Sequence, residues 1–155
     1  MTEQSCAVVT GGSAGIGAAI TKKLLEDGYR VISLARRAPD FSHPQLSFYE
    51  VDLADEEETA RIAADIARQY EVTVLVNNAG VIRPSLIEDV RLEDLNYLTR
   101  LHLGAMITLT QAFLPALKPN GFGRIVHMSS PALVSLPGRP RPPLPPAADI
   151  LLTPH

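Results

Sequence analysis

The 155-residue sequence contains one cysteine, Cys6, which excludes a disulfide framework and a cysteine-based metal site. It contains no run of about eighteen apolar residues, so a membrane-spanning helix is not expected. Basic blocks are absent and the formal net charge is -3, which argues against nucleic acid as the main partner. The first ten residues, MTEQSCAVVT, lack the basic and apolar regions of a signal peptide. These absences lead us to expect a cytoplasmic protein without a metal site.

Apolar residues make up 46% of the sequence and charged residues 20%, a balance typical of a globular domain with a hydrophobic core. Short apolar runs alternate with segments in which apolar residues recur every three or four positions, as in strands that alternate with helices. The runs predict strands over residues 6–10, 30–35, 46–52, 72–80 and 123–130. The periodic segments predict helices over residues 15–27, 55–70 and 92–117. Cys6 lies in the first run and is expected to be a buried small side chain.

The alternation predicts parallel βαβ units and hence an α/β fold, a doubly wound parallel sheet of Rossmann type with about five strands. Ile16, Ile20 and Leu24 recur every four residues and are expected to mark the buried face of the first helix. We assign residues 1–136 to this domain, whose sheet is expected to be incomplete, and residues 137–155 to a proline-rich tail. Six of the ten residues from 137 to 146 are proline, which favours polyproline II or disorder over a further strand or helix.

Three glycines follow the first predicted strand and open the first predicted helix. Gly11 permits a tight turn, Gly15 lets backbone N–H groups approach a phosphate, and Gly17 allows the helix to pack closely on the strand. A pyrophosphate at this point meets unpaired N–H groups and the positive end of a helix dipole. The spacing therefore predicts a nucleotide-binding loop at the carboxyl end of the first strand.

A glycine loop of this kind commonly binds a dinucleotide, and the end of the second predicted strand then discriminates between NAD(H) and NADP(H). An acidic side chain at this position binds the ribose hydroxyls and repels a 2′-phosphate. The sequence has Ala35 there, followed by Arg36 and Arg37. Because arginine binds a phosphate through two parallel hydrogen bonds, Arg36 favours NADP(H) over NAD(H), and Ser13 offers an additional hydroxyl contact.

Four segments, in order along the chain, resemble the short-chain dehydrogenase/reductase family. The segments are TGGSAGIG (10–17), VDLAD (51–55), NNAG (77–80) and GRIVHMSS (123–130). In that family the acid at the position of Asp52 reaches the adenine. The resemblance implies a fold that binds NAD(P), with cofactor contacts from Gly11, Ser13, Gly15, Ile16, Gly17, Arg36, Asp52, Leu53, Asn78, Ala79 and Gly80.

The resemblance also implies hydride transfer between the nicotinamide and a small alcohol or carbonyl substrate. Ser130 matches the family's catalytic serine, and His102 stands where the family has an asparagine that holds a water relay. The family's acid–base tyrosine falls at Pro143 and its lysine partner at Ala147, neither of which can transfer a proton. The resembled activity is therefore expected to be impaired in this chain.

Three hypotheses about function stay open. The first is an NADP(H)-dependent oxidoreductase of the short-chain dehydrogenase type. The second is a truncated or frame-shifted, catalytically inactive fragment that binds a nucleotide. The third is an interaction module, because Arg139, Pro142 and Pro145 form an R-x-x-P-x-x-P pattern that fits the aromatic groove of an SH3-type domain. An incomplete sheet also predicts self-association through its exposed edge.

Overall fold

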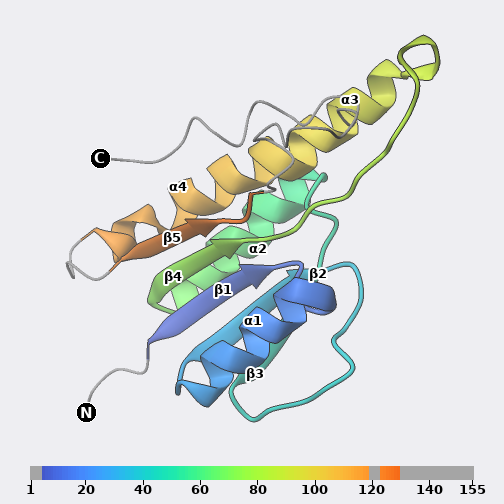
Figure 1. Ribbon diagram of the computed structural model, residues 1–155. Coiled ribbons are helices and arrows are strands. Elements are labelled where there is room, and N and C mark those ends of the chain that lie inside the picture. The colour runs from blue at the N-terminus through green and yellow to red at the C-terminus, as the bar shows by residue number, and fades with distance from the viewer. Residues whose placement is uncertain (1–4, 119–122, 130–155) are drawn as a thin grey trace.

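The computed structural model describes residues 5–118 and 123–129, which Figure 1 shows as one sheet with helices on both faces. Within these residues, parallel strands pair in the order β3-β2-β1-β4-β5. The strands are β1 (Cys6–Thr10), β2 (Arg30–Ala35), β3 (Leu46–Glu50), β4 (Val72–Asn77) and β5 (Arg124–His127). The helices are α1 (Gly15–Glu26), α2 (Glu56–Gln69), α3 (Leu92–Thr99) and α4 (Ala105–Leu117), with short segments η1 (Ile87–Asp89) and η2 (Arg100–Gly104). The predicted α/β fold is confirmed, and the proline-rich tail lies outside the described residues.

Helices enclose the central strands from two sides (Figure 1). Helix α1 packs on one face of the sheet, and α2 and α4 pack beside each other on the opposite face. Along β1, Ala7 and Val9 belong to the hydrophobic cluster under α1, whereas Cys6 and Val8 belong to the larger cluster under α2 and α4. Because both faces of the strand are buried, β1 is a continuous apolar run, which is why the sequence predicts it clearly.

Helix α1 turns the expected face to the sheet only in part. Ile20 and Leu24 pack against the cluster under the helix as expected, but the fully buried residues are Gly17, Thr21 and Leu25, one position further along the chain. The Ile16 side chain is 64% exposed. The N-terminal turn of the helix touches the backbone of the preceding loop, so only a residue without a side chain fits there, and Gly17 takes the inward position. Gly28 follows the helix with a φ of 87°, the left-handed conformation that commonly ends helices, and so agrees with the predicted end of the helix at residue 27.

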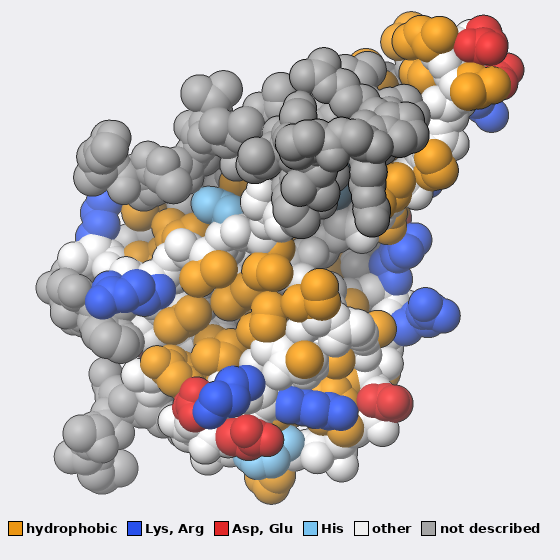
Figure 2. Space-filling view, in the orientation of Figure 1, with side chains coloured by type: hydrophobic (Ala, Val, Ile, Leu, Met, Phe, Trp, Pro, Cys, Tyr) orange, Lys and Arg blue, Asp and Glu red, His pale blue; other side chains and the backbone are white. Residues whose placement is uncertain are grey.

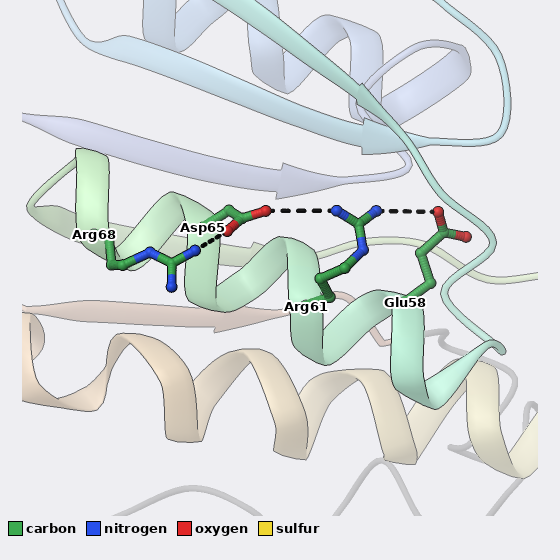
Figure 3. Close-up of polar contacts among 4 residues, drawn as sticks. All are labelled: Glu58, Arg61, Asp65 and Arg68. Carbon is green, nitrogen blue, oxygen red and sulfur yellow. Dashed lines mark hydrogen bonds and ion pairs between the residues drawn. The ribbon is translucent and has the colours of Figure 1, made fainter.

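Helix α2 begins where the sequence predicts and carries charges along its outer face. The Asp55 carboxylate accepts a hydrogen bond from the Glu58 N–H at 3.0 Å and so caps the helix. Figure 3 shows the row of ion pairs that follows, formed by Glu58, Arg61, Asp65 and Arg68. Arg61 lies 3.4 Å from Glu58 and 3.5 Å from Asp65. Since these side chains are in contact with solvent, each pair contributes only about 0.5 kcal/mol, and this face of α2 is a solvated surface.

The long helix predicted over residues 92–117 contains an interruption. Helices α3 and α4 are joined by η2, a segment in π-helical conformation in which the Ala105 N–H bonds to the Arg100 carbonyl. A single wide turn of this kind inserts one extra residue into a helix and is frequent at functional sites. His102, the predicted site residue of this helix, lies within η2.

A hydrophobic arm, residues 82–95, projects from the body of the molecule (Figures 1 and 2). Helix α3, which forms its base, buries no residue. Arg83, at the start of the arm, pairs with Asp94 of α3 and lies 4.2 Å from the ring centre of Tyr97 of the same helix. An ion pair and a cation–π contact therefore hold the two ends of the arm together. The exposed apolar residues of the arm are Ile82, Leu86, Ile87, Val90, Leu92 and Leu95, with exposed fractions from 48% to 90%. Among the described residues, none of the helices has the length and apolar character that crossing a bilayer requires.

Candidate functional site

The glycine loop lies over the carboxyl ends of β1 and β2. Residues 11–14 connect β1 to α1, and the Gly11 N–H donates to the Leu34 carbonyl of β2 at 2.8 Å. This bond draws the loop across the strand ends. Gly11 and Gly15 have φ values of 65° and 54°, a left-handed conformation that costs other residues roughly 1–2 kcal/mol each. The path of the loop therefore favours glycine at both positions.

Gly17 is required for a steric reason. A Cβ at this position would lie 2.0 Å from the Gly11 carbonyl oxygen and 2.5 Å from Asn78 Nδ2. Both distances are far inside van der Waals contact, so any side chain here forces the helix away from the loop. The first turn of α1 is consequently packed directly against the backbone that leaves β1.

Hydrogen bonds join the glycine loop to the segment 77–80 after β4. Asn78 Nδ2 donates to the Thr10 and Gly11 carbonyl oxygens, at 3.1 and 3.3 Å. Thr10 Oγ1 in turn accepts the N–H groups of Asn78 and Ala79, each at 2.9 Å. The structure thus brings Asn78 and Ala79 to the edge of the glycine loop and ties the ends of β1 and β4 into one hydrogen-bonded unit.

Two buried hydroxyl groups hold the tip of the glycine loop from below. Thr21 Oγ1 of α1 donates to the Gly12 carbonyl at 3.2 Å. Ser33 Oγ of β2 lies 3.3 Å from Ser13 Oγ, within hydrogen-bonding distance. Both Thr21 and Ser33 are completely buried. The hydroxyl of Ser13, one of the predicted cofactor contacts, is therefore oriented by the protein itself.

The N-terminus of α1 offers backbone donors to a ligand. Its N-cap residue, Ala14, makes no side-chain hydrogen bond to the helix, and the first turn carries no acidic residue. The space around Gly15 where a Cβ would stand is open, and the Ile16 side chain points outward. Because the first N–H groups of a helix need a cap, water or ligand, this end suits an anion. The donors and the helix dipole therefore fit the pyrophosphate of a dinucleotide.

The predicted contacts for the adenosine end lie beyond β2 and β3. Arg36 follows β2 directly and its side chain is exposed. Asp52 follows β3, and its carboxylate accepts the Ala54 N–H at 3.0 Å. Leu53 is buried in the main core. All three stand at the carboxyl ends of these strands, on the β3 side of the glycine loop.

His102 lies on the opposite side of the loop, toward β4 and β5. Its Nε2 is 3.2 Å from the Val81 carbonyl oxygen, and a Cβ added to Gly80 would be 2.8 Å from its Cε1. The imidazole thus packs closely over the segment 77–80. Beneath it is a cavity of about 20 Å³ lined in part by Asn77 and His127, whose Nδ2 and Nδ1 atoms are 3.2 Å apart. A polar cavity of this size holds about one water molecule.

Ser130, the predicted catalytic serine, lies outside the described residues, as do Pro143 and Ala147. In the part of the chain that the structure describes, no group of three or more His, Cys, Asp or Glu side chains forms a metal site. Cys6 is 2% exposed, which confirms that it is a buried side chain. Burial raises the pKa of its thiol to about 11.

Three residues at this end of the sheet were not predicted from the sequence, namely Thr10, Thr21 and Ser33. The sequence contained a signal for Thr10, because a hydroxyl at the end of a strand next to a glycine turn readily hydrogen-bonds to nearby backbone. It contained no signal for Thr21 and Ser33, since the role of a single hydroxyl residue inside an apolar helix or strand depends on its neighbours in the folded structure.

Comparison with known proteins identifies the family of the chain. The sequence matches the short chain dehydrogenase profile over residues 5–139. A "Probable NADP-dependent dehydrogenase" of Haemophilus influenzae is 35% identical over 134 residues, which cover 80% of this chain and 52% of that protein. The chain spans about half the length of the curated relatives it matches.

Solved structures share the fold. A "putative NAD(P) dependent gluconate 5-dehydrogenase" from Beutenbergia cavernae, with NADP bound at low occupancy, is 30% identical, with a TM-score of 0.75, over 86% of this chain and 57% of that one. A short chain dehydrogenase from Leptospira borgpetersenii with bound NAD+ is 25% identical, with a TM-score of 0.77, over 86% of this chain and 54% of that one. Since the family profile also extends over every described strand and helix, the chain belongs to the short chain dehydrogenase family.

Proposed function

We propose that this chain is the nucleotide-binding part of an NADP(H)-dependent oxidoreductase of the short-chain dehydrogenase type. The observation that carries the proposal is the glycine loop, in which Gly17 packs against Gly11 and Asn78 binds the loop from the β4 side. Together with the uncapped N-terminus of α1, this loop forms a cradle for a pyrophosphate. When bound, the nicotinamide donates or accepts a hydride, and the residues of this chain bind and orient the dinucleotide.

The two sides of the glycine loop have separate tasks in this proposal. On the β3 side, Asp52 and Leu53 receive the adenine and Arg36 binds the 2′-phosphate. On the β4 side, the contacts toward the nicotinamide come from Asn78, Ala79 and Gly80. The substrate class is a small alcohol or carbonyl compound, whose oxygen the Ser130 hydroxyl binds.

The choice of NADP(H) rests on charge at the end of β2. The strand ends at Ala35, which offers no carboxylate to ribose hydroxyls, and Arg36 follows with an exposed guanidinium group. Among similar proteins, NADP is named for the Haemophilus relative and bound in the Beutenbergia structure, whereas the Leptospira structure holds NAD+. The fold therefore accommodates both cofactors, and the side chains at this strand end decide between them.

Replacing Arg36 tests the cofactor assignment. Fluorescence titration of Arg36→Ala with NADPH should show an affinity about 10- to 100-fold below that of the wild type, because a charge-assisted contact to phosphate is lost. NADH affinity should be nearly unchanged. Arg37→Ala is the matched control and should have a much smaller effect. Unchanged NADPH affinity in Arg36→Ala would show that the assignment is wrong.

Turnover is expected to be low even where NADPH binds. His102 can hold a water molecule beside the segment 77–80, but Pro143 and Ala147 stand at the positions of the family's acid–base pair. General acid–base catalysis contributes about 10²- to 10⁴-fold to rate, so the substrate oxygen lacks an efficient proton donor. Purified chain with NADPH and a panel of ketones and aldehydes should therefore bind the cofactor without ordinary turnover. Reduction at a normal enzymatic rate would refute this part of the proposal.

Self-association through the β5 edge is part of the same proposal. In the described part of the sheet β5 is an outer strand, and Val126 and Met128 are 43% and 38% exposed. Figure 2 shows hydrophobic side chains gathered on the front of the molecule near this region. An outer strand with apolar side chains favours pairing with another chain. Light scattering of the wild-type chain should give a mass above that of the monomer, and the Val126→Lys variant should give a lower mass. A wild-type chain that stays monomeric at every concentration would contradict this expectation.

A further inference from the structure

Ser33 is a polar residue inside a strand that is otherwise apolar. β2 runs RVISLA, and the four residues from Val31 to Leu34 are all completely buried. A buried hydroxyl without a partner is costly, so an alanine or valine would be the simpler choice if the position served packing alone. The Ser33 hydroxyl lies 3.3 Å from the Ser13 hydroxyl, which is part of the glycine loop. Its hydrogen bond therefore reaches out of the strand toward the nucleotide site.

The glycine loop has the shape that this contact requires. A Cβ added to Gly12 would lie 2.7 Å from Ser33 Oγ and 2.8 Å from Thr21 Oγ1. Because Gly12 has no side chain, both hydroxyl groups can approach the loop closely. Thr21 then binds the Gly12 carbonyl, whereas Ser33 reaches the side chain of Ser13. One hydroxyl fixes the backbone of the loop, and the other orients a group that faces the ligand.

We propose that Ser33 is a positioning residue that strengthens the preference for NADP(H) by orienting the Ser13 hydroxyl toward the 2′-phosphate, an inference that rests on the NADP(H) binding proposed above. When Ser33 donates to Ser13 Oγ, the Ser13 proton is left for a ligand oxygen. A phosphate presents several strong acceptor oxygens, and its hydrogen bonds to a fixed donor are about twice as strong as neutral ones. The 2′-hydroxyl of NAD(H) both donates and accepts, so it gains less from a fixed donor.

A double-mutant cycle on the full chain tests this role. NADPH and NADH dissociation constants are measured for the wild type, Ser33→Ala, Ser13→Ala and the double variant. Ser33→Ala should weaken NADPH binding by about fivefold, the value of one hydrogen bond, and leave NADH binding nearly unchanged. Because Ser33 acts through Ser13, adding Ser33→Ala to Ser13→Ala should cause no further loss.

Two further variants keep the test decisive. Thr21→Ala removes support from the loop backbone and should weaken both cofactors by the same factor. Ser33→Cys keeps the shape of the side chain with a slightly larger atom and is a poor donor. It should therefore reproduce the loss of NADPH affinity if circular dichroism shows that Ser33→Ala does not fold.

Two results would overturn the role of Ser33. The first is an equal loss of both cofactors in Ser33→Ala and in Ser33→Cys, and the second is an undiminished effect of either change in the Ser13→Ala background. With a wild-type preference for NADPH still present, either result would leave the proposed function intact. A wild type without that preference would refute the cofactor assignment and the role of Ser33 together.

Discussion

Replacing Gly17 with alanine perturbs the closest backbone approach in the glycine loop. The new Cβ would stand 2.0 Å from the Gly11 carbonyl oxygen and 2.5 Å from Asn78 Nδ2. The oxygen belongs to the backbone and cannot rotate away, so α1 must move outward by about 1.4 Å, from 2.0 Å to 3.4 Å, to restore an ordinary contact. The substitution therefore separates the first turn of α1 from the loop that it supports.

Two opposing effects set the magnitude. Inserting atoms into a tightly packed contact costs about 1–3 kcal/mol, and a clash with backbone belongs at the upper end of that range. Alanine is favoured over glycine within a helix by about 1 kcal/mol, which offsets part of the cost. We expect the steric effect to win, so that Gly17→Ala lowers the free energy of unfolding by about 2 kcal/mol.

Urea denaturation followed by circular dichroism measures the stability change, and NADPH titration measures the site. Gly28→Ala is a contrasting control, because Gly28 has a positive φ of 87° and nothing within 4 Å of its missing Cβ, so the change strains the backbone without a steric clash. It should lose about 1 kcal/mol through backbone strain and keep its NADPH affinity. Gly17→Ala should lose stability and most of its NADPH affinity. If Gly17→Ala proves as stable as the wild type and binds NADPH equally well, the steric reasoning is refuted.

Three further predictions follow from single contacts. Asn78→Ala removes the amide that donates to the Thr10 and Gly11 carbonyls. It should lower the free energy of unfolding by about 1–3 kcal/mol, measured by urea denaturation, and a wild-type midpoint would contradict this. Asp55→Ala removes the N-cap of α2 and should lower the free energy of unfolding by about 1 kcal/mol. Asp55→Asn, whose side-chain oxygen can still accept the hydrogen bond, should keep most of the wild-type stability. The Cys6 thiol has a folded pKa of about 11 against an ordinary 9.0, so the unfolded state ionises first. Relative to Cys6→Ala, the free energy of unfolding should fall between pH 9 and pH 11 by up to about 3 kcal/mol, and equal slopes for both proteins would exclude this effect.

The sequence was sufficient for the central strands because helices cover both of their faces. β1, β2 and β4 are buried on both sides, so each stands out as an apolar run between glycines or charges. The cap at Asp55 and the glycine stop at Gly28 were also predictable, since each depends on local chemistry within one turn of its helix.

Features that depend on contacts between distant segments were not predictable. The inward position expected for Ile16 was wrong, because the packing of Gly17 against the Gly11 carbonyl arises only in the folded loop. The π-helical turn at His102 lies inside a continuous helical pattern and has no marker in the sequence. Ser33 appears as one polar residue in a strand, and its meaning comes only from Ser13, twenty residues earlier.

Titration of the wild-type chain with NADPH and, separately, with NADH tests the central claim most directly. Isothermal titration calorimetry gives the affinity without relying on turnover. The glycine loop and Arg36 predict saturable binding of both dinucleotides at one site, with NADPH bound at least about tenfold more tightly, as one charge-assisted contact implies. Absence of saturable binding, or an affinity for NADH equal to that for NADPH, would contradict the account.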